Sequence, residues 1–144
     1  MRVRWLELAI ALVFVIATSR AAYAQVSVDG GYFTTGGTGG SIGAAVSLQL
    51  FKTPVVPLTV ETTAAAALNG EGFAATLDLR FRLAGGTAIG GGVGIGNLAV
   101  TQNANIMYEG LVSQQILPHL AAELRLYAGP FRPSSFFAGL RLTL

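Results

Sequence analysis

The chain has 144 residues, of which 52% are hydrophobic and only 11% are charged, and it contains 19 glycines and no cysteine. This composition is too apolar for an ordinary soluble domain, and the lack of cysteine excludes a disulfide framework and a thiolate metal site. After the N-terminal segment there is no run of about 18 apolar residues, so the sequence does not predict transmembrane helices. Amphipathic strands are the remaining way for such an apolar chain to cross a membrane.

The first 24 residues have the pattern of an export signal. Arg2 and Arg4 form a basic start, residues 8–17 form an apolar core, and residues 22–24 (Ala-Tyr-Ala) match an A-x-A cleavage site. The apolar run is too short for the alternative, an uncleaved membrane anchor. We therefore expect residues 1–24 to be a cleaved signal peptide and residues 25–144 to form an outer-membrane β-barrel domain.

Cleavage would also remove the net charge of the chain. The formal net charge of +2 comes entirely from the signal segment, because residues 25–144 hold six basic and six acidic side chains. No basic patch remains, and aromatic residues are not interleaved with Arg and Lys. We therefore expect no nucleic-acid partner.

Alternation of apolar with small or polar residues predicts eight β-strands in residues 25–144. In chain order they are predicted at 26–34, 41–51, 58–68, 73–83, 88–100, 105–116, 119–128 and 136–144. The fourth is the most regular, with an apolar odd face and with Asp78, Arg80 and Arg82 on the even face. A tilted strand of about 9 to 11 residues is long enough to cross a bilayer.

The connections between these strands are too short for crossover helices. The sequence therefore predicts an all-β fold, an eight-stranded antiparallel up-and-down transmembrane β-barrel. In a barrel of this size, side chains fill the interior, so we expect no water-filled pore.

The polar face of the predicted strands carries nearly all their charges, which must be paired if this face points into the barrel. Registers fixed by turn length and face parity predict three opposite-charge pairs: Glu61 with Arg80, Glu109 with Arg125, and Glu123 with Arg141. A slip of two residues would instead set Glu61 opposite Asp78 or Arg82. Pairing of the first and last strands, with Ser27 opposite Thr143, would bring Asp29 to Arg141.

The candidate site is thus a structural network of interior charges, and the alternative is a solvated charged face. Its predicted members are Asp29, Glu61, Asp78, Arg80, Arg82, Glu109, Glu123, Arg125 and Arg141.

Four glycines, Gly90, Gly92, Gly94 and Gly96, share one face of the fifth predicted strand. A register with Arg82 opposite Ala88 would set Arg80 opposite Gly90 and Asp78 opposite Gly92. We therefore expect the glycines to make room for the long charged side chains.

The sequence does not indicate catalytic, cofactor or metal chemistry. The single histidine, His119, has no serine on its own strand face, so a chance triad with Ser113 and Glu109 of the preceding strand is the alternative. Residues 94–99 match a dinucleotide fingerprint as text, but no helix is predicted after them. One histidine and scattered carboxylates form no metal cluster. We expect no catalytic residue, no cofactor and no metal.

A cleaved signal, eight amphipathic strands of about ten residues and a chain that ends on its last strand resemble the small eight-stranded outer-membrane barrels of Gram-negative bacteria. The similarity is to the OmpA-like transmembrane barrel type without a periplasmic domain, and it extends over residues 25–144. It implies contact with outer-membrane lipid and recognition of the C-terminal strand by the barrel assembly machinery. It does not determine the oligomeric state.

The leading hypothesis is therefore a non-enzymatic integral outer-membrane protein with a structural or surface-interaction role and a filled, non-conducting interior. Its predicted surface loops, 35–40, 69–72, 101–104 and 129–135, are short. One alternative is a soluble exported β-barrel that holds an apolar ligand against an inward apolar face. Another is a lipid-modifying outer-membrane enzyme, because some barrels of this kind act on lipid A.

Overall fold

The computed structural model describes residues 25–35, 39–68, 72–97, 104–129 and 135–144. The predicted signal peptide, residues 98–100 of the fifth predicted strand and most of the predicted surface loops lie outside the described residues. No helix in the described part of the chain is both long and apolar enough to cross a membrane.

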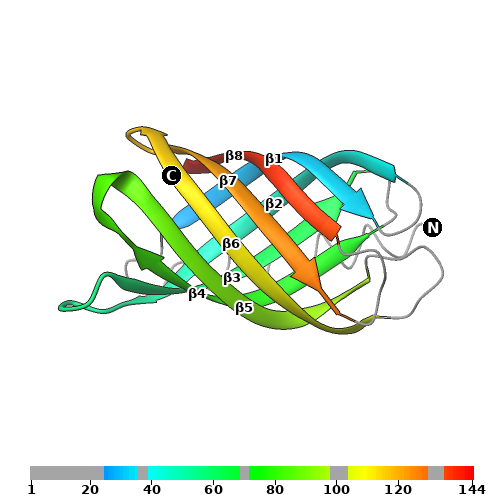
Figure 1. Cartoon of the computed structure of the whole chain (residues 1–144), viewed down its shortest axis with the longest axis horizontal. Coiled ribbons are helices and arrows are strands. Elements are labelled where there is room, and N and C mark those ends of the chain that lie inside the picture. The colour runs from blue at the N-terminus through cyan, green and yellow to red at the C-terminus, as the bar shows by residue number, and fades with distance from the viewer. Residues whose placement is uncertain (1–24, 36–38, 69–71, 98–103, 130–134) are drawn as a thin grey trace.

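Eight antiparallel strands form one closed barrel in which each strand pairs with its neighbours in sequence and β1 pairs with β8 (Figure 1). The strands are β1 (Val26–Thr35), β2 (Gly39–Lys52), β3 (Leu58–Ala67), β4 (Phe73–Arg82), β5 (Thr87–Asn97), β6 (Asn105–Leu117), β7 (Leu120–Ala128) and β8 (Ser135–Thr143), with a 3-10 turn, η1 (Ala84–Gly86), between β4 and β5. The predicted fold class is confirmed.

The two ends of the barrel differ. The end at the left of Figure 1, here the turn end, contains the connections 53–57, 83–86 and 118–119 together with residues 25 and 144. Gly85 and Gly86 have φ angles of 77° and 79°, a conformation that glycine adopts without a steric penalty. The opposite end, here the loop end, is where β1, β3, β5 and β7 finish.

Side chains alternate between the two faces of the wall, with the apolar ones outside. In β3 the burial alternates residue by residue along the whole strand. Large apolar side chains are exposed on the outer face of every strand except β3, whose outer side chains are half-buried; they include Val28, Ile42, Leu79, Val93, Ile106, Tyr108, Leu126 and Leu140. The hypothesis of a soluble barrel with an inward apolar face is therefore wrong for this structure.

Two predicted registers are confirmed. In β4 and β5, Arg82 lies opposite Ala88, so that Arg80 faces Gly90 and Asp78 faces Gly92. At the barrel closure, Ser27 of β1 lies opposite Thr143 of β8. The β4–β5 register follows from a short turn, in which the Leu83 amide donates to the Thr87 carbonyl oxygen at 2.8 Å.

Three other predicted registers are wrong, each by two residues. In the structure Glu61 lies opposite Asp78, Glu109 opposite Tyr127, and Glu123 opposite Gly139. The first is the slip that the sequence left open. In the β6–β7 hairpin a register shift also falls between Gln115 and Leu117.

The glycine face of β5 lies close to the backbone of β4. A Cβ atom added at Gly90 would lie 2.2 Å from the Leu79 carbonyl oxygen, and one at Gly92 would lie 2.1 Å from Asp78 Oδ1. These distances are far below van der Waals contact. The missing side chains thus allow β4 and its charges to occupy this part of the interior.

Candidate functional site

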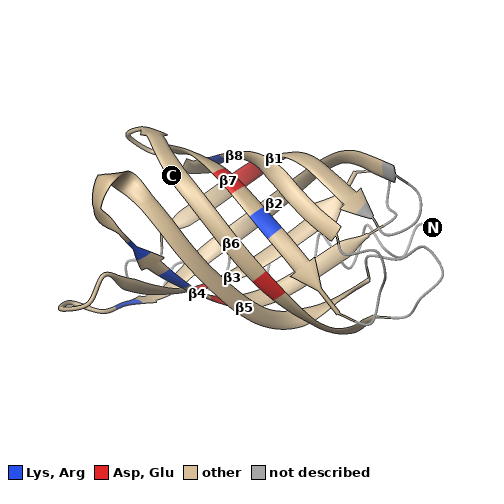
Figure 2. Cartoon of the chain, viewed as in Figure 1, with Lys and Arg blue, Asp and Glu red and all other residues tan. Residues whose placement is uncertain are grey.

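Figure 2 shows that the charged residues occupy positions in the middle of the strands and towards the turn end of the barrel. Eight of the nine residues predicted for the network are buried inside the barrel and linked by ion pairs: Asp29, Glu61, Asp78, Arg80, Glu109, Glu123, Arg125 and Arg141. The ninth, Arg82, ends β4 with an exposed side chain that has no ion pair among the described residues. Arg82 is thus not brought into the network.

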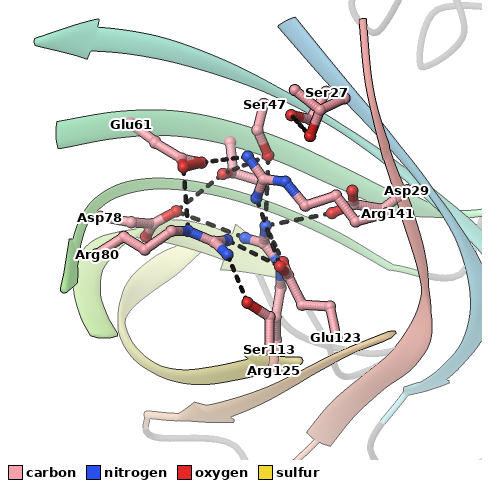
Figure 3. A network of polar contacts seen from close by, with 12 residues as sticks. Ser27, Asp29, Ser47, Glu61, Asp78, Arg80, Ser113, Glu123, Arg125 and Arg141 are labelled. Atoms are coloured by element: carbon pink, nitrogen blue, oxygen red, sulfur yellow. Dashed lines mark hydrogen bonds and ion pairs between the residues drawn. The ribbon is translucent and has the colours of Figure 1, made fainter. Parts of the chain in front are cut away.

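Arg125, on β7, is the centre of the network, and its side chain is completely buried. Its guanidinium contacts carboxylates from four strands: Asp29 Oδ2 at 3.2 Å, Asp78 Oδ2 at 3.5 Å, Glu109 Oε1 at 3.0 Å and Glu123 Oε1 at 2.5 Å. Figure 3 shows Arg125 with Asp29, Asp78 and Glu123. Arginine suits this position because its planar group offers five N–H donors.

A second layer, nearer the turn end, contains the other two buried arginines. Glu61 bridges them, with Oε1 3.0 Å from Arg80 Nε and Oε2 2.6 Å from Arg141 Nη2. Glu123 Oε2 accepts from Arg80 Nη2 at 2.9 Å and lies 3.5 Å from Arg141 Nη1. Glu123 therefore contacts all three buried arginines and connects the two layers.

Neutral side chains complete the network, and the sequence analysis missed them. Thr63 Oγ1 donates to Asp78 Oδ2 at 2.8 Å, and Thr76 Oγ1 donates to Glu109 Oε2 at 3.1 Å. Ser113 Oγ accepts from Arg80 Nη1 at 3.1 Å. Their only sequence signal is their position on the inward face, which they share with other small polar residues that do not contact the charges.

Acidic groups outnumber basic ones in the described interior. Five carboxylates, on Asp29, Glu61, Asp78, Glu109 and Glu123, surround three guanidiniums. Asp29 Oδ1 and Asp78 Oδ1 are buried without a hydrogen-bond partner in the described part of the chain. Because an uncompensated buried charge is costly, these two carboxylates are the least satisfied members of the network.

The three predicted Glu–Arg pairs are in contact even though their registers are wrong. Glu61 and Arg80 lie 3.0 Å apart, Glu109 and Arg125 3.0 Å, and Glu123 and Arg141 3.5 Å. In each case the partners are diagonal neighbours on adjacent strands, about 7–8 Å apart at their Cα atoms, a separation that an arginine side chain can span. Asp29 lies opposite Arg141, as predicted, but its ion pair is with Arg125.

An aromatic cluster fills the interior on the loop-end side of Arg125. The ring centroid of Phe33 lies 5.8 Å from that of Tyr127 and 6.0 Å from that of Phe137. Met107 is buried with them, and alanines of β2, β3 and β4 complete the cluster. Small residues on one side of the barrel thus make room for the rings from the other side.

The turn end of the interior contains a cavity of about 310 Å³. His119 lies at this cavity with an exposed side chain, whereas Ser113 and Glu109 are bound to Arg80 and Arg125. The alternative of a catalytic triad among these three residues receives no support from these contacts. No group of three metal-binding side chains is found among the described residues.

A closed eight-stranded barrel with an apolar outer face and a charged interior has the architecture of the small outer-membrane barrels, as the sequence predicted. No protein-family model and no curated protein matches the sequence. The fold is similar to the backbone structure of the Yersinia pestis outer membrane protein Ail in a phospholipid bilayer nanodisc. That match has 10% sequence identity and a TM-score of 0.57, and it covers 85% of this chain and 100% of the Ail chain. At this identity the similarity shows the fold alone.

Proposed function

We propose that this chain is a non-enzymatic integral outer-membrane protein with a structural or surface-interaction role and a filled, non-conducting interior. The observation that supports this most strongly is the apolar outer face around a closed barrel with internal charges. In water, such a continuous apolar surface would cause aggregation, whereas in a bilayer it lies against lipid. The fold similarity to an outer membrane protein supports the same location.

The strand lengths agree with a membrane location. The strands contain 9 to 14 residues, and a tilted strand of about 9 to 11 residues crosses the hydrocarbon layer. Side chains such as Ile42 and Ile106, which are 68% and 64% exposed, would contact acyl chains. Outer-membrane lipid is therefore the first partner that we propose.

We further propose that the turn end faces the periplasm. In outer-membrane barrels the periplasmic connections are short and the extracellular ones are longer, and the turn end has connections of only a few residues. This orientation places the end of β8 on the periplasmic side, where the barrel assembly machinery would recognise the C-terminal strand. Cleavage after residue 24 would leave residue 25 on the same side.

A filled interior argues against a pore function. The charge network occupies the middle of the barrel, and the aromatic cluster of Phe33, Tyr127 and Phe137 lies on its loop-end side. Eight strands leave little room beyond what such side chains occupy. We therefore propose a stable membrane-embedded scaffold that presents its loops to the surroundings.

The proposal can be tested by fractionation of cells that express the full chain, followed by gel electrophoresis with and without boiling. We expect the protein in the outer-membrane fraction, with cleavage of residues 1–24 shown by N-terminal sequencing. The folded barrel should migrate differently from the boiled sample. A protein found in the soluble periplasmic fraction, with the same mobility before and after boiling, would contradict the membrane assignment.

A further inference from the structure

We propose that the cavity at the turn end binds a small solute that carries one oxyanion, a phosphate or carboxylate, together with several hydroxyl groups. The cavity volume of about 310 Å³ is at the lower end of the range known for ligand pockets, about 300 to 1,000 Å³. Binding at this site does not depend on the function proposed above, because the cavity belongs to the barrel itself; only the choice of a free solute over a lipid headgroup rests on the proposed membrane location.

Arg82 is the group that would hold the oxyanion. It lines the cavity, its side chain is exposed, and no ion pair to it exists among the described residues. The buried arginines, in contrast, already bind Glu61 or Glu123. A guanidinium without a carboxylate partner can bind a phosphate or carboxylate through two parallel hydrogen bonds.

The charge of the cavity lining also favours an anion. Arg80 and Arg141 form its floor with Glu61 between them, and Arg82 adds a third positive charge. Glu61 is the one carboxylate among the lining residues, so the lining carries more positive than negative charge. Because the carboxylate surplus lies deeper, around Arg125, we expect the solute to bind at Arg82 and not further inside.

The walls of the cavity suit hydroxyl groups. They include the amide side chains of Gln49 and Gln115 and the hydroxyls of Ser27 and Thr143, which lie 3.2 Å apart. Amides and hydroxyls both donate and accept hydrogen bonds. A polyhydroxylated solute can therefore replace its contacts with water by contacts with these walls.

The shape of the interior determines how the solute would reach the site. Below the cavity floor the charge network and the aromatic cluster fill the barrel, so entry and exit must both occur at the turn end. Most of the lining residues lie on the strands around the interior and the others lie in the turns 83–86 and 118–119, whereas lipid would contact the outer face. A free solute is therefore favoured over the headgroup of a lipid.

The test is isothermal titration calorimetry on the full protein purified from membranes in detergent. Glucose 6-phosphate is the probe. Glucose is the control that lacks the phosphate, and inorganic phosphate is the control that lacks the sugar hydroxyls. We expect saturable binding of glucose 6-phosphate at one site, with each control bound about tenfold or more weakly. No saturable heat, or equal affinity for either control, would overturn the proposal.

Variants locate the site. Arg82→Gln should lower the affinity for glucose 6-phosphate about tenfold or more. Lys52→Gln is the control: it also removes a positive charge at the turn end, but Lys52 is exposed and does not line the cavity. It should leave the affinity unchanged. Gln49→Leu should weaken binding of glucose 6-phosphate but not of inorganic phosphate, and this variant decides the matter if Arg82→Gln fails to fold. Equal effects of Arg82→Gln and Lys52→Gln would overturn the assignment.

A lipid competitor tests the choice of a free solute. If phosphatidylglycerol in mixed micelles competes with glucose 6-phosphate for the site, that choice is overturned.

Discussion

Glu123 and Arg125 lie two positions apart on β7, and both point into the barrel, so that Glu123 Oε1 accepts from Arg125 Nε at 2.7 Å. The same carboxylate binds Arg80 and lies close to Arg141 through its other oxygen. This one acidic residue therefore compensates charge on every buried arginine that the structure describes.

The first prediction concerns this carboxylate. Glu123→Gln keeps the shape of the side chain but leaves three arginines with one fewer negative charge. We expect the free energy of unfolding, measured by urea denaturation in detergent, to fall by about 3–5 kcal/mol, the usual cost of breaking a buried ion pair. A loss below about 1 kcal/mol would show that the other carboxylates compensate for it.

The same chemical change at Asp78 should have little effect. Asp78 belongs to the surplus of carboxylates, and its Oδ1 atom has no partner among the described residues. In Asp78→Asn the amide oxygen can still accept from Thr63. We expect the free energy of unfolding to change by no more than about 1 kcal/mol. Asp78→Asn is thus the matched control for Glu123→Gln, and equal losses in both variants would contradict the described charge distribution.

A charge swap tests which acid is the main partner of Arg141. Its closest carboxylate is that of Glu61, at 2.6 Å, whereas Glu123 lies at 3.5 Å. We expect Arg141→Glu to impair folding in the heat-modifiability assay, and Glu61→Arg to restore part of it. Glu123→Arg should restore nothing, because in this background it would bring a third positive charge beside Arg80 and Arg125. Rescue by Glu123→Arg but not by Glu61→Arg would show that Glu123, the partner predicted from the sequence, is the main partner of Arg141.

The glycine face gives a packing prediction. Gly90→Leu should block folding, because its Cβ atom alone would lie 2.2 Å from the Leu79 carbonyl oxygen. Ile89→Leu, on the outer face, should be tolerated, and so should Gly110→Leu, since nothing lies within 4 Å of a Cβ atom at Gly110. The measurement is the fraction of protein that shows folded mobility before boiling. Equal tolerance of Gly90→Leu and Gly110→Leu would disprove the assigned faces.

The strands and faces could be predicted because alternation is a local property. In β4, Asp78 and Arg80 follow each other at a period of two, and any antiparallel wall must put them on the same side. The β4–β5 register was also predictable, since the turn after Arg82 is short and rich in glycine. The other hairpin registers depend on how many residues each turn uses, which alternation does not reveal.

The centre of the network could not be predicted from hairpins. Arg125 contacts Asp29 and Asp78 across the interior, and neither of these lies on a strand next to β7. Such contacts depend on the barrel's closure and shear. Face parity also does not reveal depth: Arg82 has the inward parity of Arg80 but lies at the end of its strand, where its side chain reaches solvent.

A final prediction concerns conductance. The side chains around Arg125 and the rings of Phe33 and Phe137 leave the middle and the loop-end side of the interior filled. We expect no stable open channel when the purified protein is added to a planar lipid bilayer, and a current equal to that of detergent buffer alone. Reproducible unitary steps would contradict a filled interior.

The hydrogen bond from Arg125 to Asp29 joins residues that are 96 positions apart, and the one from Arg141 to Glu61 joins residues 80 apart. Neither can form within a single hairpin. While strands are added one after another to a growing sheet, Arg125 can already pair with Glu109 and Glu123, and Arg141 with Glu123, because these partners lie on the same or the adjacent strand. The contacts of Arg125 with Asp29 and of Arg141 with Glu61, in contrast, form only when β1 meets β8. An incomplete sheet gains nothing from these two long-range contacts, so part of the stabilisation by the network appears only at closure, and such dependence on non-local contacts slows folding.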